Sequence, residues 1–158
     1  MQNPMLPSLL FPPAALIAVL FGAPVADAPP TTLLATLSGG AEVPGPGDAD
    51  GAGTVTLTLD ADKGEVCYEI GLTNVEDPTQ AHVHQGAATV TGGPVLPLSG
   101  DVAGDPAGCV KADAKVIGQI TATPADYYVN IHSKAHAAGA VRGQLRAVDT
   151  KSKPDPAN

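Results

Sequence analysis

The 158-residue chain has no Trp, three Tyr, two Phe and little positive charge, with eight Lys and Arg against 16 Asp and Glu. The few basic residues are scattered, whereas nucleic-acid binding needs clustered Lys and Arg to release counterions. We therefore expect no nucleic-acid partner. A core with so few rings must be built from Val, Leu, Ile and Ala. The 18 Gly and 16 Pro interrupt regular helices, which excludes a helical bundle and favours a single, turn-rich β domain.

Charge is absent from the first 26 residues, and Leu9 to Phe21 form an apolar run of signal-peptide length. Ala26 and Ala28 flank Asp27 in the small-x-small pattern that precedes cleavage. We therefore predict a signal peptide over residues 1–28, no stable membrane span in the mature chain, and a secreted protein, extracellular or periplasmic. The alternative is a buried or membrane-anchoring apolar segment. A linker over 29–32, a domain over 33–148 and a disordered tail over 149–158 complete the predicted organisation.

Alternation with a period of two is clearest in residues 54–60 (TVTLTLD) and again in residues 65–72, and it is typical of half-buried strands. Further strands are predicted at 33–38, 81–85, 95–98, 127–132 and 140–148, and one short helix at 112–120. The rest of 86–108, rich in Gly, Ala and Pro, is predicted to be loop. Short strands at hairpin spacing predict a mainly β fold, an antiparallel Greek-key sandwich or barrel with one short helix.

Cysteine occurs only twice, as Cys67 and Cys109. An even count in an exported chain favours one disulfide between them. The alternatives are two separate buried thiols or a reactive pair.

Four histidines fall in two places, His82 and His84 in AHVH, and His132 and His136 in NIHSKAH. Residues two apart in a strand point to the same face, so His82 and His84 can converge on one ion. If the strand of His132 faces theirs, three imidazoles meet, with His136 as a fourth ligand or a mobile neighbour. Neutral imidazole suits Cu(II), Zn(II) and Ni(II). The alternative is that these side chains only form hydrogen bonds to loop carbonyls.

Three segments resemble the CHRD domain, which is named from chordin. They are SGGAEVPG from Ser38, AHVHQGAATVTGGPV from Ala81 and YYVNIHSKAHAAGAVRGQL from Tyr127. The resemblance extends from about Leu33 to Val148 and implies an exported β-sandwich module. It also implies an extracellular protein partner, because in chordin-like proteins the domain accompanies extracellular protein binding.

The HVH strand and the later His strand with its Gly-x-x-Arg are also similar to copper/zinc superoxide dismutase. This similarity implies His82, His84 and His132 as copper ligands and Arg142 as a guide for an anion. No His stands between His84 and His132, so the zinc-binding histidines have no counterpart, and copper is expected before zinc.

The function predicted first is an exported CHRD binding module with a histidine-based site for copper or another transition metal. One alternative is a copper-only enzyme like superoxide dismutase. The other is a metal-free structural or adhesive extracellular module.

Overall fold

The computed structural model describes residues 28–148. The predicted signal peptide, apart from its last residue, and the predicted tail at 149–158 lie outside the described residues. Within residues 28–148, no helix combines the length and the apolar character needed to cross a bilayer.

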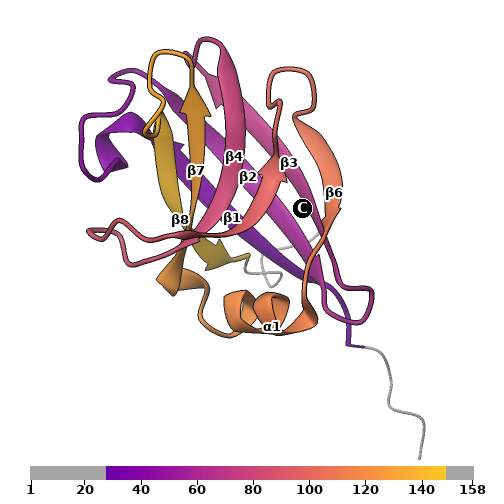
Figure 1. Cartoon of the computed structure of the whole chain (residues 1–158). Coiled ribbons are helices and arrows are strands. Elements are labelled where there is room, and N and C mark those ends of the chain that lie inside the picture. Colours follow the sequence, from indigo (N-terminus) through magenta and orange to yellow (C-terminus); the bar gives the residue numbers. More distant parts are fainter. Residues whose placement is uncertain (1–27, 149–158) are drawn as a thin grey trace, which may run out of the picture.

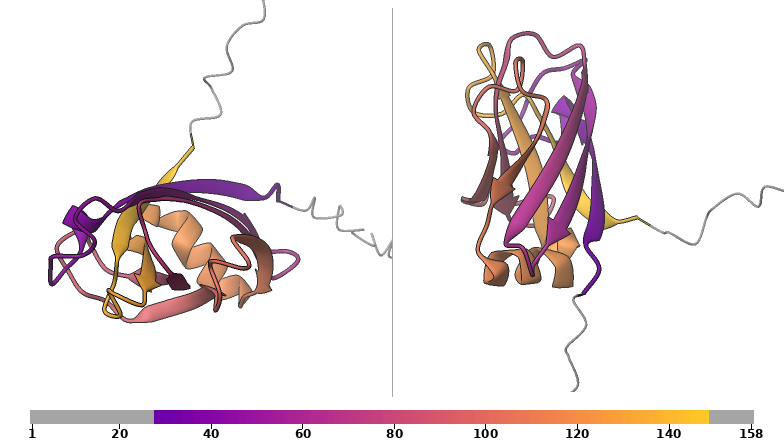
Figure 2. Two further views of the ribbon diagram at one scale, coloured as in Figure 1. Left: turned by 90° about the horizontal axis from the view of Figure 1, so that it is seen from above. Right: turned by 90° about the vertical axis from the view of Figure 1, so that its right-hand side faces the viewer.

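Eight antiparallel strands form one sheet in the order β5-β4-β7-β8-β1-β2-β3-β6. Because the end strands β5 and β6 contact each other, the sheet curls into a nearly closed barrel (Figures 1 and 2). The mainly β fold predicted from the sequence is confirmed. The strands are β1 (Thr31–Ser38), β2 (Ala52–Asp60), β3 (Glu65–Thr73), β4 (Pro78–Gln85), β5 (Pro94–Ser99), β6 (Ala107–Lys111), β7 (Tyr127–Ser133) and β8 (Val141–Ala147).

The core follows from the alternation within the strands. Every second residue of β1 and β2 points inward, and the inward side chains are aliphatic and buried. Burial of each Leu or Val side chain among them contributes about 1.5–3 kcal/mol of transfer free energy. These inward residues of β1 and β2 are Leu33, Ala35, Leu37, Val55, Leu57 and Leu59.

An α-helix, α1 (Ala114–Ala122), lies across one end of the barrel (Figures 1 and 2). Its Ile117 and Ile120 are buried in the core. The helix begins two residues later than predicted, because Asp113 is its N-cap and accepts a hydrogen bond from the Lys115 backbone N–H at 2.7 Å. Two 3-10 turns, η1 (Gly39–Ala41) and η2 (Pro124–Asp126), complete the chain's regular structure between residues 28 and 148.

Strand β6 corrects the prediction that residues 86–108 hold only one short strand. Its sequence AGCVK has no alternation of apolar and polar residues that would mark it as a strand. It is defined instead by pairing with β3, from Glu65 opposite Lys111 to Glu69 opposite Ala107. This edge strand therefore depends on contacts between residues about 40 positions apart.

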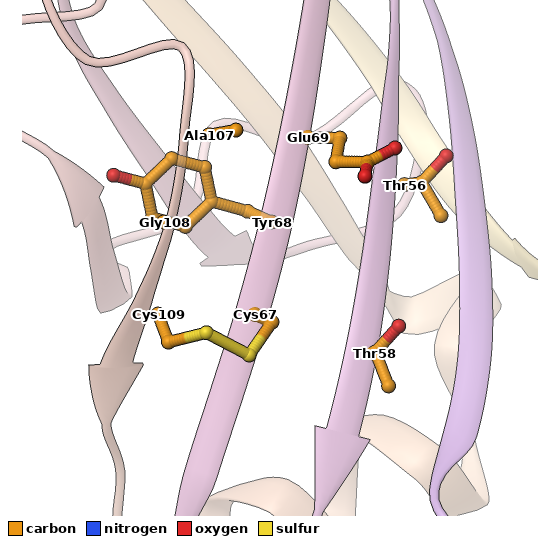
Figure 3. Close-up of a pocket in the computed structure, with 8 residues that line it drawn as sticks. All are labelled: Thr56, Thr58, Cys67, Tyr68, Glu69, Ala107, Gly108 and Cys109. Carbon is orange, nitrogen blue, oxygen red and sulfur yellow. A yellow bond between two sulfur atoms is a disulfide. The ribbon is translucent and has the colours of Figure 1, made fainter.

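A disulfide joins Cys67 of β3 to Cys109 of β6, as the sequence predicted. The two residues stand directly opposite each other in the ladder. A hollow of about 380 Å³ lies beside the disulfide, on the polar face of β2, β3 and β6 (Figure 3). The Tyr68 ring passes under β6 at Gly108, where a Cβ would come within 2.9 Å of the Tyr68 hydroxyl oxygen. The disulfide and this close approach together hold the edge strand on the barrel.

The Cys67→Ser/Cys109→Ser variant is expected to lower the free energy of unfolding by about 4 kcal/mol, because the disulfide closes a long loop in the unfolded chain. Urea denaturation of both proteins measures the difference. A thiol reductant should destabilise the wild type and leave the variant unchanged; equal stability without reductant would contradict the prediction.

Candidate metal site

His82 and His84 of β4 and His132 of β7 lie on the outer face of the barrel. The strands are direct neighbours, with His82 opposite Asn130 and His84 opposite Tyr128 in the ladder. Because Ala81 and Val83 are buried in the core, the alternation of the strand sends His82 and His84 outward. The strand of His132 therefore lies beside theirs in the same sheet, and all three imidazoles share one face.

The three imidazoles converge. One ring nitrogen from each of His82, His84 and His132 lies within 4.8 Å of those of the other two. The ring centroids of His82 are 5.9 Å from His84 and 5.3 Å from His132. Register shifts between β4 and β5 flank both His82 and His84, and such irregularities change the direction in which a side chain points.

Backbone carbonyls determine the tautomers of two of these histidines. The Nδ1 of His84 is 2.9 Å from the Gly92 carbonyl oxygen, and that of His132 is 3.0 Å from the Ala137 carbonyl oxygen. A carbonyl can only accept, so both Nδ1 atoms carry the proton and donate it. In the neutral form of either ring, Nε2 then keeps its lone pair. In metal sites, a histidine that binds the metal through one ring nitrogen usually donates a hydrogen bond from the other nitrogen, often to a backbone carbonyl.

Two donor atoms of the cluster are buried without a hydrogen-bond partner among the described residues, His82 Nδ1 and His84 Nε2. An unpaired buried polar atom costs about 1–3 kcal/mol, so these atoms are suited to an added ligand. Burial, followed by the neighbouring His132, holds the pKa of His82 below its usual value. Burial likewise lowers the pKa of His84, against the opposing bond to Gly92. Both imidazoles are therefore neutral near pH 7, as metal binding requires.

The other two predicted site residues lie elsewhere. His136 is in the turn between β7 and β8, where its backbone N–H donates to the Ser133 hydroxyl at 3.1 Å, and it lines a hollow with Asp48, Asp50 and Glu76. Arg142 of β8 is only 1% exposed. Its guanidinium does not line the pocket in front of the three histidines.

Arg142 instead organises the loop that orients His84. Its guanidinium donates to the carbonyl oxygens of Ala87, Ala88 and Val90 at 3.2–3.3 Å. The same group lies 3.7 Å from the centre of the Tyr128 ring, and Tyr128 stacks on His84 at 5.0 Å with an angle of 14° between the rings.

Gly92, at the end of that loop, contacts both His84 and Tyr128. The Tyr128 hydroxyl accepts from the Gly92 N–H at 3.1 Å and donates to the Gly92 carbonyl at 3.3 Å. A Cβ at position 92 would overlap the Gln85 carbonyl oxygen, so the loop can close back on β4 only with glycine there. The acceptor of His84 is therefore placed by the loop and by Tyr128 together.

Comparison with protein-family models gives one match, the CHRD domain, over residues 33–145. This match covers well over half of the chain. The chain belongs to the CHRD family. No curated protein and no solved structure matches the chain.

The second group of metal-ligating residue types in this CHRD domain is Glu65 with Cys67 and Cys109. The two sulfur atoms are bonded to each other, and the Glu65 carboxylate accepts from Lys111 Nζ at 3.0 Å. The potential ligand atoms of this group therefore already have partners, whereas His82 Nδ1 and His84 Nε2 have none among the described residues.

Several contributors to the histidine site escaped the sequence analysis. Tyr128, Gly92 and the Ala137 carbonyl contact the imidazoles. All three residues lie in the segments that resemble the CHRD domain, but their residue types did not indicate these contacts. The alternation of residues 127–132 places Tyr128, Asn130 and His132 on one face, and this was the available signal for Tyr128. The two carbonyl acceptors had no signal, because they depend on where loops fold.

Glu42 covers the same outer face beside the histidines. It is 8% exposed, and Asn130 Nδ2 donates to both of its carboxylate oxygens at 2.9–3.0 Å. Burial raises the pKa of Glu42, against the lowering effects of the Asn130 bond and of Arg142. Asn130 Oδ1 has no partner among the described residues. With the amide turned over, its oxygen would take the place of Nδ2 and accept a hydrogen bond from a protonated Glu42.

A raised pKa for Glu42 means that the folded state binds its proton more tightly than the unfolded state. Its contribution to stability is full below the unfolded pKa and is lost as the pH rises through the folded pKa. The free energy of unfolding of the wild type should therefore fall, relative to that of Glu42→Gln, as the pH rises above about 4.5. Urea denaturation of both proteins over this range measures the difference. A flat or rising difference curve would contradict the raised pKa.

Proposed function

We propose that this CHRD domain is an exported module that binds a transition-metal ion, copper in the first place, through His82, His84 and His132. The observation that carries the proposal is the convergence of three ring nitrogens within 4.8 Å on one face of β4 and β7. Two of these residues have their tautomers set by backbone carbonyls. Two ring nitrogens of the cluster are buried and have no hydrogen-bond partner within residues 28–148.

The donor set supports copper. Three neutral imidazoles without a thiolate suit Cu(II), Zn(II) and Ni(II), and the affinity of such a site is highest for Cu(II). A three-histidine site with an open position is an arrangement used for chemistry on small molecules, whereas a structural zinc site is closed by four ligands. His136 lies apart from the cluster, so a closed structural zinc site is the less expected arrangement.

Export is supported by the disulfide, since disulfides persist in oxidising compartments. It is also supported by the apolar leader in the sequence. Family membership supports a binding module, and we include an extracellular protein among its partners. The enzyme alternative has less support, because the buried Arg142 cannot meet an anion at the histidines.

Titration of the purified mature protein with Cu(II) tests the metal site, with isothermal calorimetry as the measurement. We expect one tight site in the wild type, and at least a hundredfold weaker binding in His82→Ala/His132→Ala, because only one imidazole of the cluster remains. His136→Ala is the matched control, a histidine outside the cluster, and should bind like the wild type. Equal affinity in the wild type and the double variant would refute the proposal.

Thermal unfolding separates this function from the metal-free structural module. A ligand that binds only the folded state raises stability, by about 2.7 kcal/mol at a hundred times its Kd. An unchanged melting temperature with copper and with a chelator would favour the metal-free alternative.

Tyr128→Leu is expected to weaken copper binding by about tenfold, within the range for loss of an outer partner of a ligand, because His84 loses its stacking ring and Gly92 loses the hydroxyl. Tyr128→Phe keeps the ring and should lose less. The Cu(II) electron paramagnetic resonance (EPR) spectrum should broaden in the Leu variant as the orientation of His84 becomes less defined. Identical affinities and spectra in all three proteins would show that Tyr128 does not position His84.

A further inference from the structure

The three histidines form one wall of a pocket of about 530 Å³. Among the described residues, its lining includes one lysine, Lys134, and no carboxylate. The remaining lining residues are polar or small, namely Thr79, Gln80, Pro94, Ser133 and Ala137. A metal ion held by His82, His84 and His132 would therefore face a pocket that contains no anionic group of the protein.

This composition leaves the charge of the metal uncompensated. Three neutral imidazoles around Cu(II) give a site of charge 2+, and the donor atoms His82 Nδ1 and His84 Nε2 are buried. A charge that is partly removed from water is costly unless it is paired. An anion in the open coordination position supplies the missing negative charge, whereas a water ligand leaves the charge unchanged.

Lys134 adds a second positive charge at the rim. Its Nζ is 3.2 Å from an Asp77 carboxylate oxygen, and the two side chains are 73% and 65% exposed. An ion pair so open to water contributes at most about 1 kcal/mol. The ammonium group can therefore turn towards a ligand in the pocket at small cost. The chain as a whole carries a net charge of −8, so any attraction for an anion must come from this local arrangement.

We propose that the metal-loaded pocket binds a small monoanion, with one donor atom on the metal and Lys134 as its second contact. This inference rests on the proposed metal site and names the class of ligand that the site takes. It also assigns to Lys134 the contact with the anion that the sequence resemblance implied for Arg142. The other residues that line the pocket, Thr79, Gln80, Pro94, Ser133 and Ala137, carry no negative charge.

Azide is the probe, because its binding to Cu(II) produces a charge-transfer absorption band. The full mature chain is loaded with one equivalent of Cu(II) in chloride-free buffer, and the EPR spectrum first establishes histidine coordination and occupancy in each variant. Azide is then titrated into the wild type, Lys134→Met and Lys111→Met. Lys111 is the matched control. It is an exposed lysine that, like Lys134, pairs with a carboxylate, here that of Glu65, but it lies on β6 and does not line the pocket.

We expect saturable azide binding in the wild type and a Kd about three- to tenfold higher in Lys134→Met, the size expected when one unit charge is lost several ångströms away near a protein surface. Lys111→Met should match the wild type. The absence of an azide band, or equal Kd values for the wild type and Lys134→Met, would overturn this inference and leave the copper site standing. If the wild type shows no histidine-dependent copper signal, the proposed function fails and the inference fails with it.

Discussion

The pairing of β4 with β7 is the constraint on which the candidate site depends. The ladder sets His82 opposite Asn130 and His84 opposite Tyr128. Since side chains alternate along a strand, burial of Val83 commits its two histidine neighbours to the outer face. A slip of one residue in this register would send the imidazoles into an aliphatic core. The hydrophobic core and the histidine cluster are therefore set by the same ladder.

A buried polar layer outside the barrel completes the site. Burial of the Arg142 guanidinium is costly in itself, and its bonds to three loop carbonyls and its contact with the Tyr128 ring offset that cost. The loop held in this way supplies the Gly92 carbonyl that orients His84. Glu42 belongs to the same polar layer and accepts hydrogen bonds from Asn130. Polar contacts on the outer face of the sheet therefore fix the orientation of the His84 imidazole, and the apolar core lies on the other face.

The disulfide and the histidine cluster lie on different strands of the barrel. The disulfide and the Tyr68 contact hold the edge strand β6 against β3. The histidines lie on β4 and β7, and β5 stands between β4 and β6 where the barrel nearly closes. Because the imidazoles point away from the core, the site adds side chains to the fold without contributing to the hydrophobic packing. The open pocket in front of them follows from the same placement.

The sequence by itself determined the mainly β class, most strands, the short helix and the shared face of His82 and His84, because alternation and spacing are local properties of the chain. Tertiary structure alone decided that β4 and β7 are neighbours, and that β6 is a strand. It also decided that Arg142 is buried under a loop, where the sequence resemblance implied a residue guiding an anion. Each of these depends on contacts between residues far apart in the chain, and His136 shows the result: it is four residues from His132, yet the turn after β7 carries it away from the cluster.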